Sequence, residues 1–354
     1  MSSLYGENLK ITVFGQSHSQ AIGVVIDGFP AGVKIDELEL QKFMDRRAPG
    51  RLYTTPRKEK DEVKFLSGLN ENGLTCGAPI MAIIENTNVK SKDYDNIKLC
   101  PRPSHSDLVS MLKHGEGADI RGGGQFSGRL TAPICIAGGI AMQVLKGLGV
   151  NVGAHIYKIG KAVDDSYSTT SQEIPINLPD FPSLNPESAS KMQDELLSAI
   201  EDGDSVGAVI ECKITGVPVG LGEPMFDGVE SRLAKILFGI PAVKGFEIGA
   251  GFSVADKKGS ENNDQIVLDN ENKIVTETNN DGGVNGGITN GMPILFKVAF
   301  KPTPSISKPQ KSVNLKTMQE EVLEIKGRHD PCVAIRAVPV VEAAAAIAIL
   351  DMYL

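Results

Sequence analysis

Residues Pro339–Leu350 read Pro-Val-Val-Glu-Ala-Ala-Ala-Ala-Ile-Ala-Ile-Leu, a helical pattern in which Glu342 is the one charged side chain. A second stretch, Pro133–Leu145, is rich in alanine and glycine and is also apolar on nearly every side. A helix with so little polar surface is buried all round and does not lie on a protein surface. With antiparallel strands on either side, two such helices predict an α+β fold. We expect a β/α/β sandwich with its sheets outside and its helices in the middle.

Short runs rich in β-forming residues flank these helices and predict the strands of the two sheets: Ile11–Phe14, Ile22–Ile26, Ile80–Ile84, Ala208–Ile214 and Ile294–Phe300. Helical spacing predicts four further helices: Asp36–Arg46 (with Asp36 and Glu39 as a capping box), Ser188–Ile200, Val229–Phe238 and Leu315–Ile325. The alternative is an α/β sheet covered by outer helices. That fold requires a regular alternation of strands and helices, which this chain keeps poorly.

The chain repeats several short patterns in the same order. Arg121 and Arg129 are eight residues apart before the first apolar helix, and Arg328 and Arg336 are eight apart before the second. We therefore expect a single domain, 1–354, that arose by duplication, with halves at approximately 1–150 and 200–354. Polar runs near 166–186 and 256–285 are expected to be excursion loops.

Charge narrows the classes of function. The formal net charge is -8 and the pI about 5.3, which argues against a general nucleic-acid binder. An acidic protein with basic loops suits a small polyanion better than DNA or a membrane surface. The alternative is ordinary solvated surface charge. The clustered arginines are Arg46, Arg47, Arg51, Arg57, Arg102, Arg121, Arg129, Arg328 and Arg336.

The cysteines and the apolar segments indicate the cellular compartment in which the protein is expected. The five cysteines form no closely spaced pair and the five histidines are dispersed, so we expect no metal site and no disulfide framework. Met1–Thr12 lacks an apolar segment, so no secretory signal is expected. The longest apolar stretches, Ala132–Leu145 and Val338–Leu350, are shorter than the roughly 20 residues that span a bilayer. These features predict a reduced, cytoplasmic protein without a membrane partner.

Four loops carry histidine, aspartate and arginine among Gly, Pro and Ser. Such side chains in loops suit proton transfer on an anionic small molecule. For Asp330 the alternative is a turn residue that hydrogen-bonds its own backbone. The four loops are Phe14-Gly15-Gln16-Ser17-His18, Arg102-Pro103-Ser104-His105, Arg121–Thr131 and Arg328-His329-Asp330-Pro331-Cys332.

Two segments are candidates for holding phosphate. The run Gly122–Gly128 has neither the spacing of a dinucleotide-binding turn nor the Gly-Lys-Ser/Thr of a P-loop. Its backbone N–H groups could still hold an anion ahead of the Pro133 helix, or it could be a tight turn. Lys301-Pro302-Thr303-Pro304-Ser305 offers a charge and hydroxyls on a stiff backbone, or is a simple strand exit.

Together, and in this order, the four loops resemble those of chorismate synthases, and the resemblance runs from about Gly6 to Asp351. The family's RHDPC is unchanged at Arg328–Cys332, and its RPGHAD corresponds to Arg102–Asp107. The departures include Gln16 and Ser19 in the family's FGESHG and Pro304 in its KPTSS. In its glycine-rich loop they are Gln125, Phe126, Gly128 and Leu130.

The resemblance implies a 1,4-elimination in which 5-enolpyruvylshikimate 3-phosphate loses phosphate and a C6 proton to give chorismate, without net redox change. It also implies a requirement for reduced FMN delivered by a separate reductant, a homotetramer, and a role in the shikimate pathway of aromatic amino-acid biosynthesis. Two carboxylates and a phosphate on the substrate agree with the many arginines. Whether Arg47 and Arg51 contact this substrate or a nicotinamide nucleotide such as NADP stays open.

The resemblance also assigns roles to residues. His105 protonates the reduced flavin near N1 and O2, and His18 assists the departing phosphate. Asp330, beside flavin N5, relays the proton that leaves C6, with Ser127 in the same relay. The residues expected to bind substrate are Arg46, Arg47, Arg51 and Arg129. Those expected to bind the cofactor are Gln125, Phe126, Ser127, Pro241, Ala242, Gly286, Lys301, Pro302, Thr303, Pro304, Ser305 and Arg328.

Two other functions fit parts of this pattern. An anion-binding protein could use the same loops for a phosphorylated metabolite or an RNA backbone, although binding alone does not need His18, His105 and Asp330. A degenerate family member, suggested by departures such as Gln16 and Gln125, would bind flavin without turnover.

Overall fold

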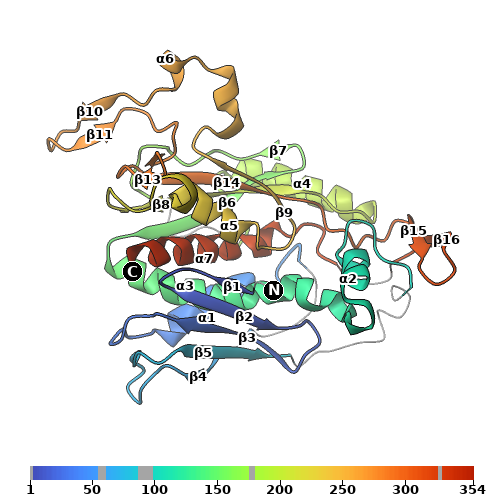
Figure 1. The fold of residues 1–354 in the computed structure, drawn as a ribbon. Coiled ribbons are helices and arrows are strands. Elements are labelled where there is room, and N and C mark those ends of the chain that lie inside the picture. Colours follow the sequence, from blue (N-terminus) through green and yellow to red (C-terminus); the bar gives the residue numbers. More distant parts are fainter. Residues whose placement is uncertain (1–2, 55–60, 87–98, 175–179, 326–328) are drawn as a thin grey trace.

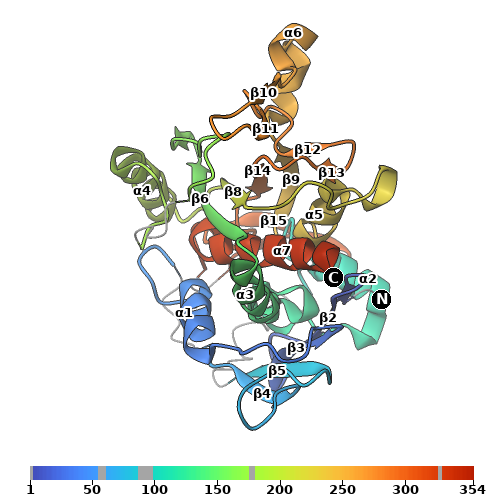
Figure 2. The ribbon, with the colours of Figure 1, turned by 90° about the vertical axis from the view of Figure 1, so that its left-hand side faces the viewer.

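A computed structural model describes residues 3–54, 61–86, 99–174, 180–325 and 329–354. Figure 1 shows three layers, with two five-stranded sheets outside and helices between them. Figure 2, turned by 90°, shows the same layers from the side. The strand pairs of both sheets are antiparallel. The predicted α+β sandwich is therefore confirmed, and the alternative with a parallel sheet and outer helices is wrong. The helices between the sheets are α1 (Glu37–Arg47), α3 (Thr131–Gly147), α5 (Val229–Leu237) and α7 (Ala334–Tyr353).

The first sheet has the strand order β1-β2-β3-β5-β4. Its central strand β3 pairs with β5, with Ile22 opposite Ile84 and Ile26 opposite Ile80. All four side chains are buried, because alternate residues of a strand point to the same face. The strands are β1 (Leu4–Tyr5), β2 (Lys10–Gly15), β3 (Ala21–Asp27), β4 (Lys64–Ser67) and β5 (Ile80–Glu85).

The second sheet has the order β7-β6-β8-β14-β9. Phe296 of its strand β14 lies opposite Cys212 of β8 and is fully buried. Unlike the first sheet, β8 also buries polar side chains of its other face, Glu211 and Lys213, because the segment after β7 covers that face. The strands are β6 (Asn151–Ile159), β7 (Ala162–Val163), β8 (Ala208–Thr215), β9 (Val243–Ile248) and β14 (Ile294–Phe300).

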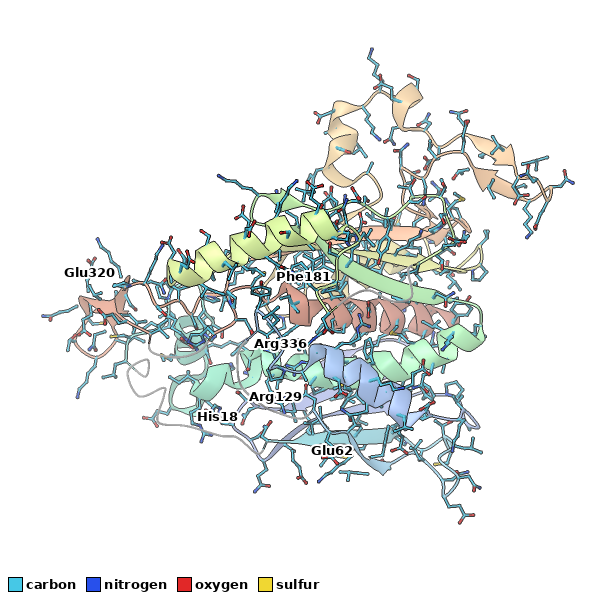
Figure 3. The ribbon with its side chains drawn as sticks, turned by 180° about the vertical axis from the view of Figure 1, so that it is seen from behind. His18, Glu62, Arg129, Phe181, Glu320 and Arg336 are labelled. Atoms are coloured by element: carbon cyan, nitrogen blue, oxygen red, sulfur yellow. The ribbon has the colours of Figure 1, made fainter. Side chains whose placement is uncertain are left out.

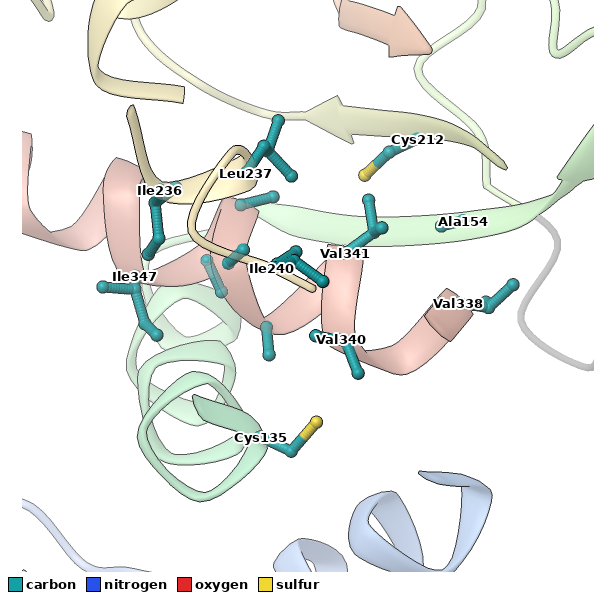
Figure 4. Close-up of a cluster of buried hydrophobic side chains, with 14 of the residues drawn as sticks. Cys135, Ala154, Cys212, Ile236, Leu237, Ile240, Val338, Val340, Val341 and Ile347 are labelled. Atoms are coloured by element: carbon teal, nitrogen blue, oxygen red, sulfur yellow. The ribbon is translucent and has the colours of Figure 1, made fainter. Parts of the chain in front are cut away.

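Helices α3 and α7 run side by side between the sheets (Figure 1). They approach so closely that a Cβ added at Gly138 of α3 would collide with the backbone of Ala343 in α7. Every residue of α7 from Ala337 to Asp351 is buried. Figure 4 shows its valines and isoleucines packed among side chains of β8, α3 and α5. The all-round apolar composition of this helix therefore follows from contacts on every side.

The remaining helices and hairpins lie around this core. They are α2 (Asp107–His114), α4 (Pro186–Glu201), α6 (Gly259–Asn262), the hairpin of β10 (Ile266–Leu268) and β11 (Ile274–Thr276), the hairpin of β12 (Val284–Asn285) and β13 (Ile288–Thr289), and the hairpin of β15 (Gln310–Asn314) and β16 (Gln319–Leu323). Short 3₁₀ turns are η2 (Gly115–Gly117), η3 (Arg121–Phe126), η4 (Gly128–Leu130), η5 (Met225–Asp227) and η6 (Gly251–Asp256).

Of the two hydrogen bonds in the capping box predicted for α1, one is present. The Asp36 side chain accepts the backbone N–H of Glu39 over 2.9 Å, as a helix N-cap does. The backbone N–H of Asp36, however, donates to Gln143 of α3 instead of to Glu39.

Helix α7 begins at Ala334, earlier than predicted, so Pro339 lies inside it. Proline has no backbone N–H, so α7 lacks one backbone hydrogen bond at this position.

The helix predicted at Leu315–Ile325 is wrong. Strands β15 and β16 occupy this region and pair from Gln310↔Leu323 to Asn314↔Gln319. The apolar residues that suggested a helix are separated, because Met318 is exposed in the turn and Leu323 is buried beside Cys100. Tertiary pairing here overrides the local helical pattern.

The two predicted excursions differ from simple loops. Region 256–285 forms α6 and the β10–β11 hairpin, which project from the upper sheet in Figure 1. Region 166–186 runs irregularly to the start of α4, and its residues 175–179 lie outside the described part.

The strand order β2-β3-β5-β4 of the first sheet repeats as β6-β8-β14-β9 in the second, and helices α3 and α7 follow the two sets of strands. The repeated order supports the duplication, which stays a prediction.

One helical run of the described chain, Arg121–Gly147, is long and apolar enough by length and composition to cross a membrane. It is longer than the Ala132–Leu145 stretch expected from the sequence because short 3₁₀ turns precede α3. Helix α3, its main part, packs against α1, α7 and the first sheet. Its composition is accounted for by burial in the protein core.

Candidate active site

The histidine of the first loop lies against the glycine-rich loop. Ser17 donates its backbone N–H to the carbonyl of Gly124 over 3.1 Å. Gly122 has a φ of 60°, and a Cβ there would lie 2.6 Å from His18 Nδ1. Glycine is needed at this position by its backbone conformation and by the closeness of the imidazole ring.

The next glycine, Gly123, lies close to the second histidine, His105. A Cβ added at Gly123 would lie 3.6 Å from both His105 Nε2 and Ser127 Cβ. His18, His105 and Ser127 thus surround one short stretch of backbone, although they come from separate parts of the sequence.

A buried carboxylate holds the loop that carries His105. Asp107, the first residue of α2, accepts hydrogen bonds from Arg102 Nε over 2.7 Å and Nη2 over 2.8 Å. His105 Nδ1 lies 2.6 Å from the same carboxylate. Burial alone would raise the pKa of Asp107, but Arg102 and His105 lower it well below its usual range. Arg102 Nη1 also donates to Ser305 Oγ over 3.0 Å, which joins this loop to Lys301–Ser305.

The segment Lys301–Ser305 has further contacts with the same region. Lys301 Nζ donates to the carbonyl of Ser104, and the backbone N–H of Lys301 donates to Ala242 over 3.0 Å. Ser104 and Ala242 have φ values of 57° and 74°, which side-chain-bearing residues rarely adopt and which often mark functional loops. Thr303 Oγ1 is buried and makes no hydrogen bond to any described residue.

Asp61 links two arginines in the interior. Its carboxylate is fully buried and accepts from Arg47 Nη1 over 2.5 Å and from Arg129 Nη1. Burial alone would raise the pKa of Asp61, but the two guanidinium groups lower it below its usual value. Arg47 also donates from Nε to Thr131 and from Nη2 to the carbonyl of Gly128. All three nitrogens of Arg47 therefore have internal partners, which gives Arg47 a positioning role here; its contact with substrate stays a prediction.

Arg129 connects this network to the first loop. Its Nε donates to Asn86 Oδ1 over 3.2 Å. Asn86 Nδ2 in turn donates to the carbonyl of Ser19 over 2.9 Å and to that of Gln16 over 3.3 Å. The turn that holds His18 is thereby fixed relative to the Arg129 guanidinium.

Arg336 extends the network to the fourth loop. Its Nη1 donates to Asp330 Oδ2 over 2.8 Å, and its Nε donates to the carbonyl of Arg47 over 3.1 Å. Burial and the neighbouring Arg47 lower the pKa of Arg336. Among the described residues joined by these hydrogen bonds, three are arginines (Arg47, Arg129 and Arg336) and two are carboxylates (Asp61 and Asp330).

Helix ends add to this positive field. Figure 3 shows His18, Arg129 and Arg336 at the left-hand end of the central helices. Both α3 and α7 begin here, at Thr131 and Ala334. The N-terminal ends of helices favour negative charge, so the region as a whole is suited to an anion.

The other two arginines predicted to bind substrate differ in their partners. Arg46 donates twice to the buried Glu342 of α7, over 2.7 and 2.9 Å, and so neutralises a carboxylate in the core. Arg51 donates from Nη2 to Asp180, whose side chain is fully exposed. Exposed ion pairs of this kind contribute little to stability, and the contact of Arg51 with substrate stays a prediction.

Not all predicted cofactor residues meet in one place. Ala242, the residue after Pro241, reaches the cluster through its hydrogen bond with Lys301, whereas Phe126 is partly exposed and Gln125 lies beside His114. Gly286 lies in the β12–β13 turn, at the left of Figure 1, whereas α2 lies at the right. Arg328 lies outside the described residues.

Sequence reasoning did not single out Asp61, Asn86, Asp107 or Arg336 as site residues. Asp107 could have been found, because it follows His105 by two residues in the same motif. Asp61 stands in the charged run Lys-Glu-Lys-Asp-Glu, which looks like solvated surface and carries no such signal. Within the described part of the chain, no group of three or more His, Cys, Asp or Glu side chains could hold a metal ion.

A family model described as chorismate synthase matches residues 9–354 of this chain. The chain belongs to the chorismate synthase family. It is similar to proteins named chorismate synthase from Lancefieldella parvula (42% identical, covering 99% of this chain and 96% of that protein), Methanobrevibacter smithii (45%, 99% and 96%) and Lachnoclostridium phytofermentans (46%, 99% and 95%). A solved structure entitled "Crystal Structure of Chorismate Synthase" matches with a TM-score of 0.75 and 27% identity, over 98% of this chain and 92% of that one.

Membership of the chorismate synthase family makes the chain an enzyme, a lyase of the shikimate pathway. The resemblance first drawn from the four loops is thereby confirmed over nearly the whole length. The roles of individual residues remain proposals.

Proposed function

We propose that the chain converts 5-enolpyruvylshikimate 3-phosphate to chorismate by 1,4-elimination of phosphate, and that it requires reduced FMN. The observation that supports this most is the unbroken set of hydrogen bonds from Asp330 through Arg336, Arg47 and Asp61 to Arg129. It gathers three guanidinium groups beside the candidate proton-transfer groups. A substrate with two carboxylates and a phosphate requires such charge-assisted donors.

The segment Lys301–Ser305 fits the phosphate of FMN. A buried hydroxyl is normally hydrogen-bonded, so the unpartnered Thr303 Oγ1 among the described residues suggests a missing acceptor. Lys301 and Ser305 would add a charge and a second hydroxyl, with Arg102 behind them. When bound, reduced FMN supplies a transient electron donor and a proton acceptor.

Three side chains of the chain would handle protons. An imidazole ring can both accept and release a proton. His18, against Gly122, would give a proton to the departing phosphate, and His105 would hold one at Nε2 toward the cofactor. Asp330 would take up the C6 proton at its carboxylate, oriented by Arg336, with Ser127 in the same relay.

Other parts of the proposal rest on the family alone. These are a homotetramer, a cytoplasmic location and reduced flavin delivered by a separate reductant. The last agrees with the glycine-rich loop Gly122–Gly128, which lacks a nicotinamide-binding fingerprint.

The proposal is tested by mixing the protein with FMN, dithionite and 5-enolpyruvylshikimate 3-phosphate under anaerobic conditions and following chorismate absorbance. Turnover that depends on reduced FMN supports it. Binding of flavin and substrate without product would indicate a relative that has lost turnover, and anion binding without flavin would indicate a binding protein. As a control, Asp202→Asn alters an exposed partner of Lys308 and should keep wild-type turnover.

A further inference from the structure

His105 and Asp107 face each other at the start of α2. His105 Nδ1 lies 2.6 Å from Asp107 Oδ1. Two acceptor atoms without a proton between them repel each other at this distance, so a proton lies between the two. Asp107 is ionised, because Arg102 donates to it from both Nε and Nη2. The proton therefore belongs to the imidazole Nδ1.

The alternative is a ring whose Nδ1 carries no proton and accepts a hydrogen bond from Arg102, and the contacts support it less. Arg102 Nη2 lies 3.1 Å from the same nitrogen and would suit a ring whose Nδ1 accepts a hydrogen bond. That distance is longer, and Nη2 already donates to Asp107 Oδ1 over 2.8 Å. Ser106 Oγ, at 3.4 Å, is farther still. Asp107 and Arg102 are thus the charged groups at this edge of the ring, and their charges cancel.

Asp107 is a rigid support. It is 1% exposed and also accepts the backbone N–H of Arg102 over 3.2 Å. Through Arg102 Nη1 and Ser305 Oγ it is connected to the segment proposed to hold phosphate. At the other edge of the ring, Nε2 lies near Gly123, and Ser127 Cβ lies near the same glycine.

We propose that Asp107 is a positioning residue that keeps the proton of His105 on Nδ1 and leaves Nε2 as the atom that gives and takes a proton in the reaction. The role of Nε2 rests on the proposed function, whereas the tautomer does not. A carboxylate that orients a catalytic imidazole in this way also stabilises the imidazolium that forms during proton transfer.

The tautomer is measured by two-bond ¹H–¹⁵N correlation spectra of histidine-labelled protein without added cofactor, recorded from pH 6 to 9. His105→Gln identifies the signals by their loss. The neutral ring should carry its proton on Nδ1 in the wild type. In Asp107→Asn the amide can donate to Nδ1, so the proton should move to Nε2. A wild-type ring protonated on Nε2, or an unchanged tautomer in Asp107→Asn, would overturn the proposal. If Asp107→Asn fails to fold, the wild-type spectrum alone decides.

Turnover provides the second readout. With reduced FMN, Asp107→Asn should lower kcat at least about tenfold with little change in KM, because the group acts on proton transfer and not on binding. Asp351→Asn is the matched control: Asp351 is equally buried, accepts from Arg232 over 2.9 Å, and lies at the far end of α7. It should lower stability while leaving kcat and the His105 spectrum unchanged.

The two proposals fail in different ways. An inactive wild type would count against the proposed function and leave the spectroscopic test intact. An active wild type together with a folded Asp107→Asn of normal kcat would overturn the positioning role.

Discussion

Arg336 donates a hydrogen bond from Nη1 to Oδ2 of Asp330 over 2.8 Å. The two residues lie on either side of the start of α7, so folding of this buried helix sets the position of the carboxylate. Arg336 Nε is held in turn by the carbonyl of Arg47. The core, through Arg336, therefore takes part in setting the orientation of Asp330.

Asp330→Asn should bind FMN and substrate almost normally and lose about 100-fold or more in turnover. The amide matches the carboxylate in shape and can still accept from Arg336, but it cannot take up a proton. Flavin binding by fluorescence and chorismate formation at saturating substrate check this. Wild-type turnover with bound cofactor would reduce Asp330 to a turn residue.

His18→Ala and His105→Ala should each lower kcat by about 10- to 1000-fold, the usual scale for acid–base catalysis. His114→Ala, which removes a histidine beside Gln125, serves as the control and should stay close to wild type. Steady-state assays with reduced FMN provide the measurement. Unimpaired rates in both variants, with flavin bound, would exclude these assignments.

Arg51→Ala and Arg129→Ala should each weaken substrate binding about tenfold, because a charge-assisted hydrogen bond contributes roughly 1.5–3 kcal/mol. Arg129→Lys should also weaken it, since lysine cannot reproduce the planar fork of donors. Equilibrium binding of substrate to the FMN-loaded enzyme tests this. Unaltered affinity in all three variants would mean that these arginines are structural.

Asp61→Asn should lower the free energy of unfolding by about 3–5 kcal/mol, because it leaves the buried Arg47 and Arg129 without their shared carboxylate. Glu187→Gln, which breaks the exposed pair with Lys191, should leave stability unchanged within error. Urea unfolding at pH 7 compares the two. A loss no larger for Asp61→Asn than for the control would contradict the proposed role of the network.

His155 predicts a pH dependence of stability. It is fully buried, with Nδ1 3.2 Å from Asp164 and Nε2 3.0 Å from Glu211. Burial alone would lower the pKa of His155, but the two carboxylates raise it above its ordinary value. In the same cluster the pKa values of Asp164 and Glu211 are lowered despite burial, mainly by His155.

The stabilisation by a raised histidine pKa is complete below the unfolded value of about 6.5 and disappears as pH rises through the folded value. The contribution of the two carboxylates is present above about pH 4 and is lost as pH falls through their lowered values. The wild type should therefore exceed His155→Gln in stability most between about pH 4.5 and 6.5, by roughly 3–5 kcal/mol. Urea unfolding from pH 4 to 9 measures the difference. A gap that widens at high pH would contradict an imidazolium at this site.

Some elements could be predicted because their signal is local. The strands Ile22–Ile26 and Ile294–Phe300 stand out by their own β-forming composition, and the Asp36 cap by its spacing from Glu39. The hairpin at Gln310–Leu323 could not be predicted from the sequence, because pairing between its two strands outweighed a local helical pattern. Motif spacing similarly pointed to His18 and His105 but not to the backbone that joins them at Gly122 and Gly123.

By itself, the sequence determined the buried central helices, and hence the layered fold, because burial follows from the composition of each helix. It also determined the family, through motifs that are contiguous in the chain. Only the tertiary structure decided how the charges are paired. Arg129 and Asp61 are 68 residues apart, and Arg46 and Glu342 are 296 apart. Electrostatic pairing depends on distance in space, and no pattern along the chain reports that distance.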